Sequence, residues 1–165
     1  YWWELRACEY YAEFEKPKII YPNILKQPEF TLDYNHWYTN QKCFIISLDD
    51  KYLLGILNSK LDNFLFEKYL PKLRGGFYEP SYVFFKEFPI KKLDPKNKAQ
   101  QSFKDEIVKL VETMLQLQQQ KKQRTLPNQI VQLDQRIEHT DNAINQKVYQ
   151  LYGLTNEEIK MKLYK

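Results

Sequence analysis

Hydrophobic residues follow two different spacings in the first 93 residues of this chain. Short runs of β-branched and aromatic residues predict three strands, at residues 18–21, 29–32 and 42–48. From residue 50 the apolar positions recur at helical spacing with a weak break, which predicts two helices, at residues 50–58 and 60–69. Pro71 helps to end the second helix, and Gly75 and Gly76 permit positive φ angles before an aromatic segment that runs to Phe88. The pattern predicts a small mixed α/β unit with irregular connections.

A seven-residue repeat replaces these patterns in the rest of the chain. Its apolar positions form two sets, one at Ile107, Leu110, Met114 and Leu117 and the other at Ile130, Leu133, Ile137, Ile144 and Leu151. The segment between them, residues 121–128, is short and polar, and Pro127 suits a helix start, so an antiparallel helical hairpin is predicted. Gly153 suits a helix C-cap, and Thr155 with Glu158 has the capping-box spacing of a short last helix.

Aromatic content changes sharply near Leu93, because only Phe103, Tyr149, Tyr152 and Tyr164 follow it. The adjoining residues 94–98 are polar, and Pro95 disfavours a helix in the residue before it, which indicates a boundary. We therefore expect two domains, residues 1–93 and residues 94–165. The predicted fold class is α+β: a small mixed α/β domain followed by an antiparallel, coiled-coil-like helical hairpin with a short C-terminal helix.

Composition excludes two classes of protein. A hydrophobic content of 43% with 16% aromatic residues is too high for a disordered chain, and no apolar run approaches the length of a membrane span. The net charge of +4 does not by itself distinguish a nucleic-acid surface from a solvated mixed-charge surface, since residues 1–95 hold 13 basic and 13 acidic side chains. Within residues 68–92, six basic side chains accompany two acidic ones, which favours a modest basic face.

The start of the chain has neither an initiator Met nor the basic and apolar segments of a signal peptide. We therefore expect a fragment of a longer polypeptide that is not exported. Cys8 and Cys43 match no metal or redox spacing, and two such thiols fit a cytoplasmic setting.

Residues that would support catalysis are not grouped in this sequence. There is no glycine-rich cofactor motif, no P-loop and no Asn/Asp-Pro-Pro-aromatic loop of the kind that holds the target amine in amino-methylating enzymes. Glu158 and Lys160 resemble part of a metal-dependent nuclease motif, but the preceding Pro-Asp is absent, and helix-surface charge explains them better. His36 and His139 lack the spacing of zinc ligands. No catalytic residue and no metal site are predicted.

Three blocks of sequence carry a resemblance to a known family. They are residues 16–22 (KPKIIYP), residues 52–61 (YLLGILNSKL) and residues 74–76 (RGG). Together they resemble the TaqI-like C-terminal specificity domain of restriction-modification DNA methyltransferases, as in type IIG enzymes, a relative of the target-recognition domains in Type I specificity subunits. The resemblance covers about residues 2–93, and residues 142–160 look like the helical ending of such domains.

The resemblance implies a domain that reads a short double-stranded DNA sequence. The target base would pass to an adenine-specific methyltransferase domain, placed earlier in the same chain or in a partner subunit, and the parent enzyme could also cleave DNA. The resemblance implies no cofactor in this chain and S-adenosylmethionine in the methyltransferase domain. The expected location is the cytoplasm of a bacterium or an archaeon.

Candidate DNA contacts follow from the resemblance and from residue chemistry. Arg74 is the leading base reader, because its guanidinium can donate to guanine O6 and N7 together, and Gly75 and Gly76 would let the backbone approach the duplex. A surface salt bridge is the alternative role for Arg74. The candidate phosphate contacts are Lys18, Lys26, Lys72, Lys91 and Lys92. The candidate groove or flipped-base neighbours are Asn23, Trp37, Asn40 and Tyr78.

Other residues of the resembling region are predicted to serve the fold. Asp49 and Asp50 are expected to cap the following helix, and Asn58 and Ser59 are expected to satisfy backbone groups at the helix break. The leucines of the central block, Leu53, Leu54 and Leu57, are interpreted as core residues.

The helical hairpin has two interpretations. Helices of about 22 residues would be about 33 Å long, close to one turn of DNA, so the hairpin could act as a spacer or dock a methyltransferase subunit. It could equally pack back onto its own domain. Two rival functions stay open: a metal-dependent nuclease, and an interaction module that reads no DNA and dimerises or docks through Ile107, Met114, Ile137 and Ile144.

Overall fold

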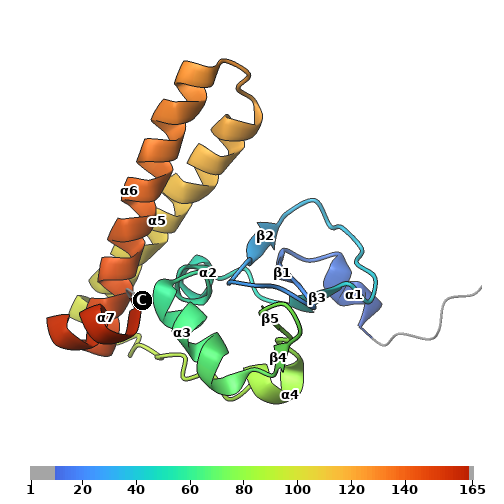
Figure 1. The fold of residues 1–165 in the computed structure, drawn as a ribbon, viewed down its shortest axis with the longest axis horizontal. Helices are drawn as coiled ribbons and strands as arrows, with labels where there is room; N and C mark the ends of the chain where they lie inside the picture. Colours follow the sequence, from blue (N-terminus) through green and yellow to red (C-terminus); the bar gives the residue numbers. More distant parts are fainter. Residues whose placement is uncertain (1–9, 164–165) are drawn as a thin grey trace, which may run out of the picture.

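The computed structural model describes residues 10–163 of the chain, so Cys8 lies outside the described part. Small antiparallel sheets combined with helices and a long helical hairpin confirm the predicted α+β class (Figure 1). Among the described residues, no helix has the length and apolarity needed to cross a membrane.

The larger sheet has three antiparallel strands in the order β2-β1-β3. They are β1 (Lys18–Pro22), β2 (Thr31–Asp33) and β3 (Cys43–Ile46), and the single-turn helix α1 (Tyr11–Phe14) precedes them. Ile19 in the central strand pairs with Leu32 on one side and with Ile46 on the other. The three predicted strands are therefore confirmed, with shifts at their ends.

Strand β2 begins two residues later than the alternating pattern predicts, because the side chain of Asn58 forms hydrogen bonds with the main chain of Phe30. Asn58 Oδ1 accepts a hydrogen bond from the Phe30 N–H, and Asn58 Nδ2 donates to the Phe30 carbonyl, each at 3.0 Å. Both main-chain groups of Phe30 are satisfied in this way, so the ladder starts at Thr31.

The predicted helix break separates α2 (Lys51–Leu57) from α3 (Lys60–Tyr69). Asp50 Oδ1 accepts hydrogen bonds from the N–H groups of Tyr52 and Leu53 and caps α2, and Ser59 Oγ accepts from the Asp62 N–H and caps α3. The predicted roles of Asp50 and Ser59 are confirmed. Asp49 does not cap the helix: its carboxylate accepts a hydrogen bond from the Tyr34 hydroxyl instead.

After α3 the chain forms the two-stranded hairpin of β4 (Lys72–Leu73) and β5 (Phe77–Tyr78), followed by α4 (Tyr82–Phe85). The aromatic side chains of this segment pack against the sheet. The ring of Phe85 lies 5.6 Å from the ring of Phe30 and 5.5 Å from that of Tyr21, and the rings of Phe66 and Phe88 are 5.8 Å apart. The aromatic richness of the first 93 residues thus builds the core between the sheet and helices α2 and α3.

Helices α5 (Lys98–Lys122) and α6 (Pro127–Tyr152) form the predicted antiparallel hairpin, and α7 (Asn156–Leu163) ends the described chain. Local signals placed these ends correctly. Pro127 opens α6, Gly153 takes a φ of 69° at its C-cap, and the Glu158 carboxylate accepts from the Thr155 N–H at 2.9 Å in the predicted capping box. Glu158 therefore acts as a helix cap, in line with the structural interpretation of that residue.

The part of the hairpin that contains Ile107, Val111 and Ile144 packs against α2. A Cβ atom at Gly55 would lie 2.9 Å from Val111 Cγ2 and 3.1 Å from Ile107 Cγ2, so the glycine permits a close approach of α2 and α5. Ile144 of α6 belongs to the same buried cluster, which is continuous with the core around Ile19. We call Gly55, Ile107, Val111 and Ile144 the hairpin root. The other end of the hairpin extends away from the remaining elements (Figure 1).

The buried side of α5 differs from the predicted seam. Ile107 and Leu117 are buried as predicted, but the third buried residue is Val111, and Leu110 and Met114 are only half-buried. Helix α2 also packs against α5, and the apolar pattern of an isolated two-helix pair does not include this contact. The alternative in which the hairpin packs back onto its own domain is therefore confirmed for the root.

Candidate nucleic-acid interface

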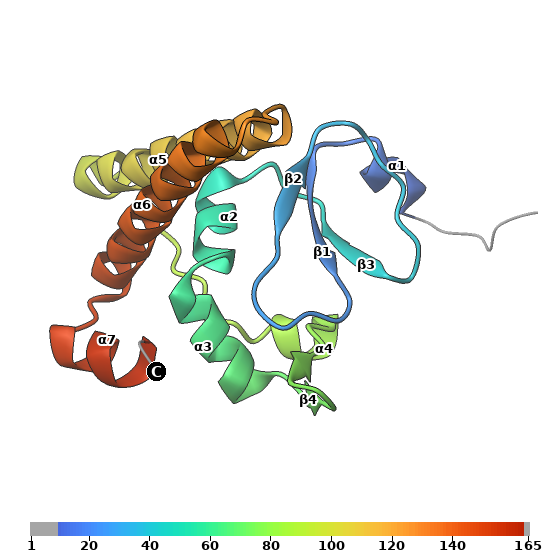
Figure 2. The same ribbon diagram turned by 45° about the horizontal axis from the view of Figure 1, so that its top comes forward.

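Three connections meet at the end of the larger sheet where β1 ends and β3 begins. The β1–β2 loop (residues 23–30) is tied to the turn before β3, because the Asn23 N–H donates to the Lys42 carbonyl at 2.9 Å. The same loop is tied to the β4–β5 hairpin, because Leu25 and Tyr78 exchange main-chain hydrogen bonds of 3.1 and 2.8 Å. Figure 2 shows this loop reaching towards β4. We call the loop 23–30, the turns 39–42 and 73–76 and the adjoining Lys72 of β4 the loop end.

The turn 73–76 requires glycine. Gly75 and Gly76 have φ angles of 87° and 78°, which side chains with a Cβ rarely adopt, and the Gly76 N–H donates to the Leu73 carbonyl. A Cβ at Gly76 would meet nothing within 4 Å, so the backbone here is open to an approaching molecule. Arg74 is exposed in this turn and forms no ion pair with any of residues 10–163. The alternative surface salt bridge is therefore not formed within the described chain.

The loop end carries more basic than acidic side chains. Its exposed basic residues are Lys26, Lys42, Lys72 and Arg74, and the exposed acidic residues beside them are Glu29 and Glu79. Lys26 Nζ lies 4.9 Å from the centre of the Phe77 ring, which places this ammonium group over the β4–β5 hairpin. Of the residues predicted from sequence, the loop end thus brings together Asn23, Lys26, Asn40, Lys72, Arg74, Gly75 and Gly76.

Lys42 and its neighbour Gln41 were missed by the sequence reasoning. Both are exposed in the turn before β3. The only sequence signal was their position between two predicted strands, and their place beside Asn23 results from the pairing of β1 with β3.

Lys18 does not reach this surface, although the sequence assigned it to a phosphate. Its side chain is 0% exposed, its Nζ lies 2.6 Å from Asp33 Oδ2, and it also donates to the Phe14 carbonyl at 2.7 Å. Burial on its own would raise the pKa of Asp33, but hydrogen bonds from Lys18 and from the N–H groups of Asn35 and Trp37 outweigh it and hold the pKa below its usual value. The ion pair is structural, and Lys18 is left out of the proposed interface.

Four further candidates are not among the exposed residues of the loop end. Tyr78 belongs to β5 but is 7% exposed, so its ring serves the core. Trp37 is 60% exposed, and its N–H donates to Asp33 at the opposite end of the sheet. Lys91 and Lys92 lie between α4 and α5, where the Lys91 ammonium donates to the Leu151 carbonyl at 2.6 Å and satisfies the C-terminal end of α6.

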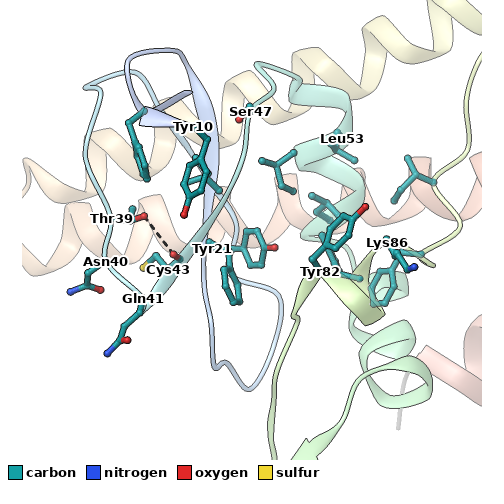
Figure 3. A pocket seen from close by; sticks show the side chains of 18 residues that line it. Tyr10, Tyr21, Thr39, Asn40, Gln41, Cys43, Ser47, Leu53, Tyr82 and Lys86 are labelled. Atoms are coloured by element: carbon teal, nitrogen blue, oxygen red, sulfur yellow. Dashed lines mark hydrogen bonds between the residues drawn. The ribbon is translucent and has the colours of Figure 1, made fainter. Parts of the chain in front are cut away.

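A groove of about 1280 Å³ adjoins the loop end (Figure 3). It runs between β3 and α4, and Phe44, Phe85 and Phe88 line it with other apolar side chains. Asn40 and Gln41 belong both to the groove and to the loop end, so the two surfaces are continuous. Among the described residues that line the groove, Lys86 is the only charged one.

The loop end and the groove fall within a region that matches a known family. The family model of the TaqI-like C-terminal specificity domain matches residues 2–90. The chain belongs to this family. No curated protein matches the chain.

The matched range of the TaqI-like specificity domain contains the loop end and the groove and stops before α5. Membership of this family supports DNA sequence recognition in a restriction-modification system.

Proposed function

We propose that this TaqI-like specificity domain reads a short double-stranded DNA sequence with its loop end and thereby directs an adenine-specific methyltransferase domain or subunit to that site. In an enzyme that also cleaves DNA, the same readout would direct cleavage. S-adenosylmethionine would bind in the methyltransferase domain. The target base would be modified there, so this chain supplies binding and specificity.

The observation that carries the proposal is that hydrogen bonds link three separate connections into the loop end, with the exposed Arg74 on one of them. A base reader must reach into a groove while neighbouring side chains hold the phosphates. Arg74 is exposed on a glycine turn with open space beside Gly76, and three further exposed lysines lie on the other two connections and on β4. A guanidinium group in this position can donate to guanine O6 and N7 at the same time.

The rival interaction module loses part of its predicted surface. Ile107 is 0% exposed and Ile144 is 6% exposed, and both pack in the hairpin root against α2. These two residues are occupied within the chain, so they cannot also form the centre of a partner interface without opening the root. The half-buried Met114 and Ile137 are the only members of that predicted set at the surface.

The test is selection of bound duplexes from a randomised DNA pool at moderate salt, with the intact chain and two variants. Arg74→Ala removes the proposed base reader. Arg124→Ala is the matched control, because Arg124 is an exposed arginine in the connection between α5 and α6, outside the loop end. The two variants lose the same charge, so a difference between them measures position and not net attraction.

We expect the intact chain and Arg124→Ala to enrich the same motif. Arg74→Ala is expected to accept any base at one G·C position of that motif, at a cost of about 1–3 kcal/mol in discrimination, while its unfolding midpoint in urea stays unchanged. If the intact chain enriches no motif, or if Arg74→Ala selects the same motif with the same stringency, the proposal for this surface is wrong.

A further inference from the structure

The turn 39–42 is held by several hydrogen bonds of its own. Asn40 Oδ1 accepts from the Lys42 N–H at 2.9 Å, the Cys43 N–H donates to the Asn40 carbonyl at 3.2 Å, and the Thr39 hydroxyl donates to the Cys43 carbonyl at 3.5 Å. The backbone of this turn is therefore fixed before any ligand binds, which reduces the entropy that binding would cost.

Asn23 fixes the same turn from the neighbouring loop. Its Nδ2 donates to the Gln41 carbonyl at 2.8 Å, and its own N–H donates to the Lys42 carbonyl at 2.9 Å. Two adjacent carbonyls of the turn are thus anchored by one residue at the end of β1. Asn23 orients the turn without using the side chain of Gln41.

The side chain of Gln41 is left available by this arrangement. Its carboxamide is exposed and forms no hydrogen bond with the described residues. Figure 3 shows it pointing outward from the turn, away from Tyr21 and the groove floor. A free carboxamide on a rigid turn is an arrangement suited to direct readout, because a carboxamide can accept from adenine N6 and donate to adenine N7 together.

We propose that Gln41 is a second base reader, specific for adenine in an A·T pair, and that Asn23 is the positioning residue that holds it. This inference rests on the proposed function and adds a second specified position to the site. Strand spacings give a path of at most about 30 Å from Gln41 through Asn23, Leu25 and Tyr78 to Arg74. One turn of B-DNA is about 34 Å long, so both readers can contact the same turn.

The experiment repeats the duplex selection with three variants of the full chain. Gln41→Ala removes the carboxamide, Gln41→Glu leaves only acceptors, and Gln119→Ala is the matched control on an exposed surface of α5. Gln41→Ala is expected to relax one A·T position by about tenfold or more, and Gln41→Glu to change the preference there from adenine to cytosine, whose N4 amino group donates. The position read by Arg74 should keep its preference in all three variants.

A second readout tests the contact itself. Duplexes of the selected motif are compared with the same duplexes carrying N6-methyladenine at the position that Gln41 reads. The methyl group replaces the donor hydrogen, so the intact chain should bind the modified duplex more weakly, whereas Gln41→Ala should bind both equally. Asn23→Ala is expected to relax the same position partially and no other.

The outcomes separate this inference from the proposed function. An enriched motif with an unchanged A·T preference in Gln41→Ala would overturn the role of Gln41 and leave that of Arg74 intact. Absence of any enriched motif in the intact chain would overturn both. Urea unfolding of each variant gives the folding control, and equal midpoints are expected for the Gln41 variants because the side chain is exposed.

Discussion

The two ends of the three-stranded sheet are built in opposite ways. At the end formed by Lys18 and Asp33, the charged side chains are buried, paired with each other and bonded to the backbone of α1 and of the following turn. At the loop end, backbone and carboxamide groups make the bonds, and the charged side chains of Lys42 and Arg74 stay exposed. The charges of the first end form a buried ion pair that stabilises the fold. At the loop end hydrogen bonds fix the backbone, and the charged side chains stay exposed and accessible to a partner.

The contrast between the two ends indicates which substitutions the fold tolerates. Changes in the loop-end side chains leave the core untouched, so a specificity domain can alter the sequence that it reads without losing its structure. Changes at the buried end, or in the framework behind the sheet, should lower stability first and affect DNA binding only through unfolding.

The largest effect is expected for Asp33→Ala, which leaves the Lys18 ammonium buried without its partner. The free energy of unfolding should fall by about 3–5 kcal/mol in urea titrations at pH 7. Because the pKa of Asp33 is lowered in the fold, its contribution is fully present above the ordinary carboxyl pKa and is lost as the pH falls below about 4. A double variant, Lys18→Met with Asp33→Leu, should recover most of the loss, and failure of the single variant to destabilise would contradict the structural role.

Gly55→Val should have the next largest effect, because it forces a side chain into the contact between α2 and α5. The loss is expected to be about 1–3 kcal/mol, measured by urea unfolding, with Gly55→Ala between the variant and the wild type. The motif selected from random DNA should not change. An altered motif would show that the hairpin root and the loop end are coupled.

Asp62→Asn is predicted to stabilise the protein. Asp62 is 1% exposed, its carboxylate oxygens have no hydrogen-bond partner within residues 10–163, and burial raises its pKa well above the usual value. The unfolded chain ionises more readily than the folded one, so stability falls as the pH rises above about 4, which is the reverse of the Asp33 trend. The variant should gain about 1–3 kcal/mol at pH 8 and little at pH 3. A pH-independent difference would show that ionisation of Asp62 is not the cause.

The smallest effect on stability is expected at the loop end itself. Lys42→Ala should change the free energy of unfolding by less than about 0.5 kcal/mol. Its effect should appear in DNA binding, as a similar loss of affinity for all duplexes and a salt dependence reduced by about one phosphate contact. A loss confined to one motif position would instead make Lys42 a base reader.

Prediction from sequence succeeded where the signal was local. The start of α2 and its break from α3 were found because Asp50 and Ser59 cap helices within three residues of themselves. The ends of α6 were found from Pro127 and Gly153 for the same reason. The start of β2 was missed because Asn58, 28 residues away, bonds both main-chain groups of Phe30.

The candidate site was predicted in part. Arg74 and its glycines were identified because an Arg-Gly-Gly turn can be recognised from the sequence. The structure shows this turn with positive φ angles at both glycines. Lys18 was misassigned because lysines are usually exposed, and its burial depends on Asp33, 15 residues later. Gln41 was overlooked because its fixed position depends on a side-chain bond from Asn23.

The α+β class, the helical hairpin and the family resemblance follow from the sequence alone, because spacing and capping act within a few residues of the chain. The folded structure was needed to show which lysines are buried, which connections are linked at the loop end, and that Gly55 lets α2 pack on the hairpin. Those outcomes depend on pairing and packing between residues distant in sequence, and such contacts form only when the whole core closes.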